Sequence, residues 1–82
     1  MKEVLDMTIA TPEGIIFEGK VESAKFPGAQ GSFAVFPLHA PLISLLTAGK
    51  IVCRQEGNPI EFDIKGGFVE VNKEVISACV ET

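Results

Sequence analysis

The chain has 82 residues, 46% of them hydrophobic, and a formal net charge of -4 from 11 acidic and 7 basic side chains. A chain of this length can bury one modest core, and the hydrophobic content excludes a disordered segment. The acidic balance leaves no basic stripe for phosphate backbones or anionic lipid, so nucleic-acid binding and direct lipid insertion are not expected. Because no repeat, low-complexity tract or linker divides the chain, we expect a single domain over residues 1–82.

No apolar run in the sequence approaches the roughly 20 residues that a membrane-spanning helix needs. The start of the chain, MKEVLDMTI, carries acidic residues where a secretory signal would place a cationic segment before a long apolar one. We therefore expect a cytosolic protein that reaches a membrane only through a partner.

The first half of the chain predicts short strands. Residues 5–9 alternate between apolar and polar side chains, as a strand with one buried face and one solvated face requires. The longer segment 15–26 does not keep one alternating frame, and a bulge or bend near Gly19 would correct its register. Two more apolar runs of strand length follow, at 33–36 and 42–46.

The second half of the chain continues the pattern. Residues 60–65 alternate apolar and charged side chains without a fault, and the runs 51–54, 68–71 and 75–80 are also of strand length. Turn-forming residues separate these runs throughout the chain, at 11–14, 27–31, 48–50, 56–59, 66–67 and 72–74. Many short strands with turns at this spacing predict an all-β fold, an antiparallel sandwich or flattened barrel.

The two cysteines, Cys53 and Cys79, each lie inside an apolar run. Neither has a second cysteine or a histidine at the spacing of a metal site. Since a free cysteine packs as a small hydrophobic residue, we expect both to be reduced and buried in the core.

The other polar residues form no recognisable catalytic or cofactor motif. The carboxylates fall mostly at alternating outward positions of strands, where solvated charges belong. Residues 48–50 look like the end of a phosphate-binding loop, but Ser44 and Ile51 occupy the positions that need a glycine and a hydroxyl residue. None of the serines considered has the glycine-flanked turn of a hydrolase nucleophile. We therefore predict no catalytic, cofactor-binding or metal site.

The only histidine, His39, lies between Pro37 and Pro41. It could be a catalytic base, a metal ligand or a packed corner of the scaffold. No cysteine or acidic residue lies near it in the sequence, while a partner from elsewhere in the fold stays possible. Because the two prolines stiffen the segment, we interpret His39 as a structural or interface residue whose ring bonds to nearby backbone.

Three segments together resemble the epsilon subunit of the F-type, proton-translocating ATP synthase. They are Gly28-x-x-Gly31-x-Phe33-x-Val35-x-Pro37-x-His39-Ala40-Pro41-Leu42, then Gly49-x-Ile51, then Gly66-Gly67-Phe68-Val69-Glu70-Val71. The resemblance covers essentially the whole chain, and it implies a ten-stranded antiparallel β-sandwich of two five-stranded sheets. It also implies a non-catalytic rotor subunit of the central stalk, peripheral on the cytoplasmic face of the bacterial inner membrane. Such a subunit links the gamma subunit to the c-subunit ring, and so couples proton translocation to ATP synthesis in the alpha/beta head.

The resemblance assigns contact residues by position. The loop facing the c ring would be Ala29, Gln30, Gly31, Ser32 and Phe33, with His39 close by at the same end of the sandwich. Part of the gamma contact would be Ala40, Pro41, Leu42 and Ile43. Many relatives carry acidic residues in the loop, whereas this chain has Gln30 and Ser32, so its contact should depend on neutral hydrogen bonds and shape. Leu38 also replaces a frequent glycine.

Typical relatives continue past the sandwich into a helical hairpin that can inhibit ATP hydrolysis and in some bacteria binds ATP. The present sequence ends at Thr82, directly after the last predicted strand. We therefore expect an epsilon-type protein without the C-terminal helical domain, without inhibition by that hairpin and without a nucleotide cofactor. The sandwich face that the hairpin covers in relatives should then be polar or covered by a partner.

Two other readings stay open at this stage. A free-standing β-sandwich that binds a small ligand or peptide at its open end would be a stable monomer with a lined cavity. A small enzyme would place His39 in a pocket beside a distant carboxylate.

Overall fold

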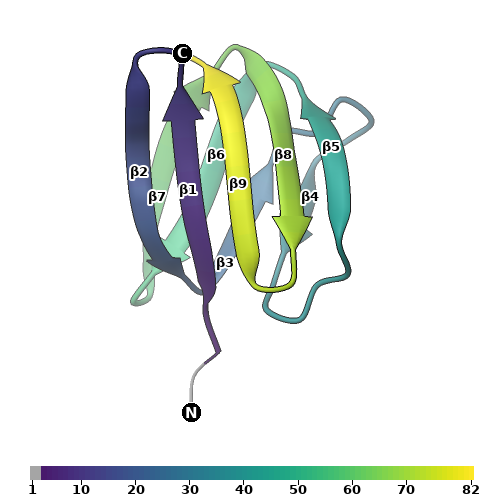
Figure 1. The fold of residues 1–82 in the computed structure, drawn as a ribbon. Helices are drawn as coiled ribbons and strands as arrows, with labels where there is room; N and C mark the ends of the chain where they lie inside the picture. Colours follow the sequence, from purple (N-terminus) through teal and green to yellow (C-terminus); the bar gives the residue numbers. More distant parts are fainter. Residues whose placement is uncertain (1–2) are drawn as a thin grey trace.

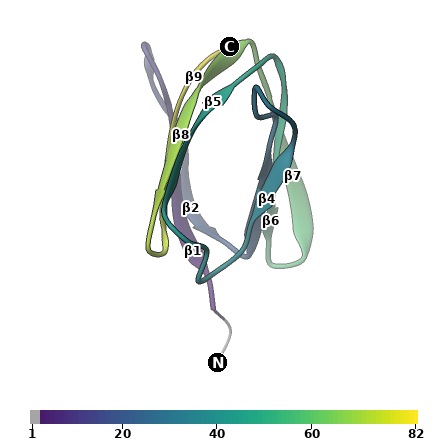
Figure 2. The ribbon, with the colours of Figure 1, turned by 90° about the vertical axis from the view of Figure 1, so that its right-hand side faces the viewer.

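The computed structural model describes residues 3–82, which form nine strands and no helix. The first two residues of the expected domain lie outside the described part. The strands are β1 (Leu5–Thr11), β2 (Gly14–Val21), β3 (Ser23–Phe26), β4 (Phe33–Val35), β5 (Leu42–Leu46), β6 (Gly49–Gln55), β7 (Asn58–Ile64), β8 (Gly66–Asn72) and β9 (Val75–Glu81). They build a five-stranded sheet, β2-β1-β9-β8-β5, and a four-stranded sheet, β4-β3-β6-β7. The two sheets face each other as a sandwich (Figures 1 and 2).

The predicted all-β sandwich is confirmed, but the expected ten strands in two five-stranded sheets are nine strands in sheets of five and four. Residues 27–29 run beside the edge of β5 and make only one isolated bridge, between Gly28 and Leu46. Pro27 has no backbone N–H to donate, and a turn at Gly28 bends the chain away before a strand can form. The sheets are also not wholly antiparallel, because β1 pairs with β9 in parallel.

The long apolar segment 15–26 is divided between the two sheets. The chain leaves β2 at Val21 and enters β3 at Ser23, and the N–H of Glu22 donates to the carbonyl of Arg54 at 2.7 Å. The predicted register shift exists, but it lies at Ile16 instead of near Gly19. Ile9 pairs with Phe17 and Ala10 with Ile15, so Ile16 is the extra residue of a bulge.

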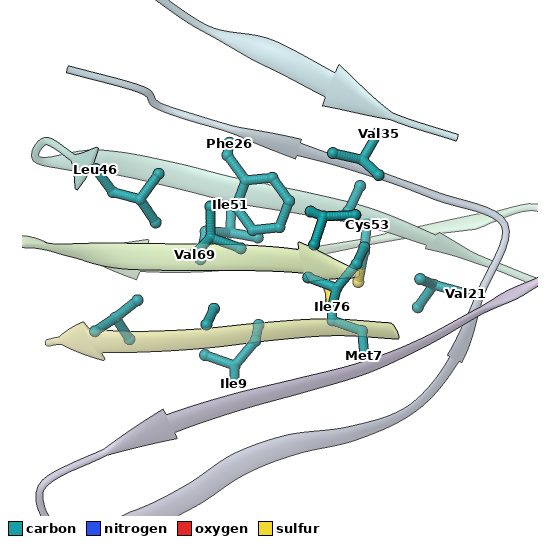
Figure 3. Close-up of a cluster of buried hydrophobic side chains, with 14 of the residues drawn as sticks. Met7, Ile9, Val21, Phe26, Val35, Leu46, Ile51, Cys53, Val69 and Ile76 are labelled. Atoms are coloured by element: carbon teal, nitrogen blue, oxygen red, sulfur yellow. The ribbon is translucent and has the colours of Figure 1, made fainter. Parts of the chain in front are cut away.

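The core fills the space between the sheets, where side chains from both layers point toward one another (Figure 3). The alternation read in residues 5–9 is the burial pattern of β1, whose Leu5, Met7 and Ile9 are at most 1% exposed. Among the described residues no polar or charged side chain is buried, so the interior is uniformly apolar. Such a core imposes no desolvation cost on polar groups.

The prediction for the cysteines is half right. Both are free thiols, and Cys53 is buried in the core at 1% exposure. Cys79 is exposed on the outer face of the five-stranded sheet, where it pairs with Phe68 of β8. It points outward because β9 alternates strictly, with Ile76, Ala78 and Val80 as its inward residues.

Candidate interaction surfaces

The loop between β3 and β4 is held in shape by its own glycines and by two aromatic rings. Phe26 and Phe33, at its two ends, stack with ring centroids 5.7 Å apart. The N–H of Gly31 donates to the carbonyl of Gly28 at 3.0 Å, and a Cβ on Gly28 would lie 2.6 Å from the carbonyl oxygen of Gly31. A side chain at Gly28 is therefore excluded. The loop presents to solvent Ala29, Gln30, Gly31 and Ser32.

The same loop is fastened to the end of β5. The N–H of Ala29 donates to the carbonyl of Leu45, and the N–H of Thr47 donates to the carbonyl of Pro27, each at 2.9 Å. These two bonds flank the bridge between Gly28 and Leu46. The position of the loop is consequently set by the sandwich, which makes it a rigid feature of the surface.

His39 lies in a tight turn between β4 and β5. Its N–H donates to the carbonyl of Phe36 at 3.2 Å, and its Nδ1, which must carry the proton, donates to the carbonyl of Ala40 at 2.6 Å. The predicted bond between the ring and nearby backbone is confirmed. Leu38, at the place of a frequent glycine, has a φ of 69°, in the left-handed region that glycine adopts without strain. The turn thereby holds the Leu38 side chain 74% exposed.

His39 does not lie at the same end of the sandwich as residues 29–33, and that prediction is wrong. The first loop lies beside Leu46, where β5 ends, whereas the turn with His39 leads into Leu42, where β5 begins (Figure 1). An extended chain advances about 3.3 Å per residue, so the three residues of β4 cover about 10 Å. The residues on either side of β4 complete the passage from one end of the sandwich to the other (Figure 1).

Between the two loops, the structure brings most of the assigned residues together along one groove. This groove has a volume of about 440 Å³ and is lined by Ala29, Gln30, Gly31, Phe33, Leu42, Ile43, Ser44 and Leu45. None of these side chains is charged. A second groove, of about 390 Å³, lies at the other end of β5 and is lined by Pro41, Leu42, Ile43, Glu70, Val71 and Asn72. The two predicted contact sets thus meet on the side of the sandwich formed by β5.

Sequence reasoning missed an apolar surface on the outside of the five-stranded sheet. Ile43, Leu45 and Phe68 are 75%, 68% and 47% exposed. Leu45 lies opposite Phe68, and Phe68 lies opposite Cys79, so these side chains are neighbours across three strands. We call Ile43, Leu45, Phe68 and Cys79 the outer apolar surface. The run LISLL of β5 does not alternate with polar residues, so its period could not reveal which leucines point outward.

The different burial of the two thiols gives a direct prediction. Burial raises the pKa of the Cys53 thiol, which suppresses the reactive thiolate, whereas Cys79 is open to solvent. One thiol per folded chain should react quickly with dithionitrobenzoate and two after unfolding in urea. In a Cys79→Ser variant the fast reaction should be absent. Two fast thiols in the folded wild type would contradict the packing of Cys53.

The charged pairs lie on strands other than β5. Lys50 bonds to Asp63 at 2.9 Å and approaches Glu61 at 3.6 Å, and the hydrogen bond to Asp63 is the main reason why its pKa is raised. Lys20 pairs with Asp6 at 2.8 Å on strands β2 and β1. These exposed pairs contribute little stability. Beside β5, the first groove has no charged side chain in its lining, whereas Glu70 lines the second.

No reactive constellation is assembled in the described part of the chain. Residues 3–82 contain no group of three His, Cys, Asp or Glu side chains that could hold a metal ion. A search of the same residues for a helix long and apolar enough to cross a bilayer found none. What the fold does present is a sandwich with one loop bonded to β5, one tight turn, a neutral groove and an apolar surface. These features define a small all-β sandwich module.

A comparison with protein families identifies the family of this module. Residues 4–82 match the family of the ATP synthase delta/epsilon chain, β-sandwich domain. The chain belongs to this family, and it corresponds to the N-terminal β-sandwich of ATP synthase epsilon chains.

Several curated relatives are named ATP synthase epsilon chain. The one from Wolinella succinogenes is 55% identical over 73 residues, which cover 88% of this chain and 56% of the relative. The one from Nitratiruptor sp. is 42% identical over 80 residues, covering 96% and 62%. The chain thus spans less than two thirds of these relatives. The one from Caulobacter vibrioides is 35% identical over 77 residues, which cover 94% of this chain and 90% of the relative.

Solved structures share the fold at low sequence identity. A chain of the Euglena gracilis mitochondrial ATP synthase, in a structure of its OSCP, F1 and c-ring, matches 96% of this chain with a TM-score of 0.90 and 21% identity. That match covers 51% of the Euglena chain. A chain of the Tetrahymena thermophila enzyme, in a structure of its central stalk and c-ring, matches 99% of this chain and 66% of its own length. Its TM-score is 0.79 at 18% identity.

Proposed function

We propose that this chain is a rotor subunit of the central stalk of F-type ATP synthase, which links the gamma subunit to the c-subunit ring. Its role would be to couple proton translocation to ATP synthesis in the alpha/beta head. The observation that carries the proposal is the placement of the loop at 27–32 and the turn with His39 at opposite ends of one sandwich. A subunit that joins two partners needs two separate contact surfaces and a stiff body between them. The names of the curated relatives support the same assignment.

The end that carries residues 29–33 is the proposed contact with the c ring. Its exposed groups are neutral: small side chains, the amide of Gln30 and the hydroxyl of Ser32. Ring loops would then be recognised by hydrogen bonds and shape, and the contact should depend little on salt. Gly31 is exposed, with no atom within 4 Å of the place a Cβ would occupy, so the loop backbone can come close to a partner surface there.

The other end, together with the β5 side, is the proposed contact with gamma. His39 belongs here, with Ala40 and Pro41 beside it in the chain and Leu42 and Ile43 at the start of β5. The outer apolar surface lies next to this set, since it includes Ile43. Exposed apolar side chains gathered in this way are typical of protein contacts. The gamma contact would therefore be larger and more apolar than the contact with the ring.

The proposed role is mechanical. Torque passes through a body whose interior is packed by apolar side chains from both sheets, and close packing resists deformation. Nucleotides, metals and reacting groups take no part in this role. The proposed location is peripheral, on the cytoplasmic face of the bacterial inner membrane, where partners hold the subunit.

The assignment of the two ends can be tested with variants that change one surface at a time. Gln30→Lys should weaken binding to the isolated c ring at least five-fold and leave gamma binding unchanged. Ile43→Asp should weaken gamma binding at least ten-fold and leave ring binding unchanged, because a carboxylate is costly to bury in an apolar contact. Glu61→Gln, on the opposite sheet, is the control and should alter neither affinity. If Gln30→Lys and Ile43→Asp both affect the same partner, the two-ended assignment is wrong.

The alternative of a free-standing ligand-binding module has less support. It requires a lined cavity that opens at the end of the sandwich, and the space between the sheets holds the packed side chains of the core (Figure 3). The alternative of a small enzyme needs a carboxylate beside His39, whose ring bonds instead to the carbonyl of Ala40.

A further inference from the structure

Leu38 occupies a place in its turn that favours glycine. The turn spans residues 36–39 and is closed by the N–H of His39, which donates to the carbonyl of Phe36 at 3.2 Å. Pro37 and Leu38 are its two central residues, and the φ of Leu38 is 69°. A proline followed by a residue of positive φ is the pattern of a type II turn, whose second central residue is usually glycine. A bulky side chain in this conformation strains the backbone.

The exposure of Leu38 sets it apart from the other strained positions. Within residues 3–82, the other non-glycine residues with positive φ are Glu56 and Lys73, at 51° and 58°. Both are charged and lie in short hairpin turns, between β6 and β7 and between β8 and β9, so water solvates them there. Leu38 is apolar and 74% exposed. A single exposed leucine is ordinary, but one that a strained backbone holds outward indicates a contact with a partner.

The turn that carries Leu38 is already ordered in the free chain. Pro37 fixes its own φ and restricts the residue before it, and Nδ1 of His39 donates to the carbonyl of Ala40 at 2.6 Å. A partner would therefore not have to order the turn on binding, which favours affinity. Phe36, which is 58% exposed, adds a second apolar side chain to the same turn.

We propose that Leu38 is the anchor of the gamma contact and inserts, together with Phe36, into an apolar hollow of the gamma subunit. This inference rests on the proposed function, because it names the residue on which the contact at this end depends. Gamma is the partner because Leu38 directly precedes the proposed gamma contact at 40–43 and lies at the opposite end of the sandwich from the loop at 27–32 (Figure 1). The hollow would be apolar because residues 36–41 include no acidic, lysine or arginine side chain.

Two substitutions separate the side chain of Leu38 from the shape of its turn. Leu38→Asn keeps a side chain of similar size, and asparagine adopts a positive φ more readily than leucine, so the turn should keep its shape. Leu38→Met keeps an apolar side chain of nearly the same volume. Binding of the purified gamma subunit and of the isolated c ring is measured by titration calorimetry for the wild type and both variants. Urea unfolding followed by circular dichroism measures their stability.

We expect Leu38→Asn to weaken gamma binding at least ten-fold, with ring binding unchanged and a urea midpoint no lower than that of the wild type. Leu38→Met should bind gamma within about two-fold of the wild type. A purely structural role for Leu38 would not lower the affinity for gamma while stability is kept.

Three results would refute the anchor and leave the stalk function standing. They are an unchanged affinity of Leu38→Asn for gamma, equal losses of affinity in both variants, and a urea midpoint of Leu38→Asn below that of the wild type. In the last case the altered turn, and not the lost side chain, would explain weaker binding. If the wild type does not bind gamma at all, the proposed function fails and this inference fails with it.

Discussion

Replacing Gly67 with alanine should lower the free energy of unfolding by about 3 kcal/mol or more, and so leave little stable fold. A Cβ at this position would lie 2.2 Å from the carbonyl oxygen of Cys79 and 2.8 Å from the Cα of Val80, both backbone atoms of the next strand. The φ of Gly67 is also 147°, which side-chain-bearing residues rarely adopt. The substitution therefore combines strain with a clash that only separation of β8 from β9 could relieve.

Urea unfolding followed by circular dichroism measures the effect, and Gly14→Ala is the matched control. Gly14 has a similar φ of 136°, but no atom lies within 4 Å of the place its Cβ would occupy. The free energy of unfolding of the control should fall by only about 1–2 kcal/mol, because the alanine adds backbone strain but no clash. Equal losses in the two variants would show that the close approach of β8 and β9 does not limit the side chain at position 67.

Truncation of Phe26 to alanine should cost about 3–5 kcal/mol, the usual range for a fully buried phenylalanine. Phe26 has no solvent exposure, and its ring stacks on Phe33 across the base of the loop at 27–32. The variant should therefore lose order in the proposed ring contact as well as stability. Urea unfolding gives the first effect, and faster exchange of the Gly31 amide gives the second.

Phe36→Ala is the control for this variant. Phe36 is 58% exposed, so its truncation should change the free energy of unfolding by less than about 1 kcal/mol. If Phe26→Ala is destabilised but the Gly31 amide keeps its protection, the aromatic stack does not position the loop, and the contacts with Leu45 and Thr47 alone would hold it.

The strands with strict alternation were predictable because one face of each is buried and the other solvated. Residues 5–9 and 60–65 carry this signal without interruption, and both form strands near the expected limits. The passage from β2 to β3 at Glu22 was not predictable in the same way. A passage from one sheet to the other interrupts the alternation of apolar and polar residues just as a bulge does. The sequence alone therefore could not show which of these two structures interrupts segment 15–26.

The exposure of Cys79 was within reach of the sequence. Ser77 and Glu81 share its parity in β9, and two outward polar residues fix the direction of the cysteine between them. In β5 no polar outward residue gives such a signal, because Ile43 and Leu45 are apolar and exposed. In the sequence, exposed apolar residues of a contact surface cannot be distinguished from buried apolar residues of the core. The outer apolar surface could therefore be recognised only in the structure.

The placement of His39 shows another limit of prediction from the sequence. The resemblance assigned His39 to the same contact as residues 29–33, and only the path of the chain through β4 shows that the turn and the loop lie apart. A run of three strand residues is too short to be conspicuous in sequence, yet the passage through it places the two surfaces at opposite ends. The two-ended form of the proposed linker follows from that passage.

The most direct test of the central claim is a purification of the tagged chain from detergent-solubilised membranes of the organism that encodes it. The proposed stalk function predicts recovery of gamma, the c ring and the alpha and beta subunits in constant ratio, with ring subunits reduced by Gln30→Lys. Recovery of the tagged chain alone, from membranes that contain intact ATP synthase, would contradict the account.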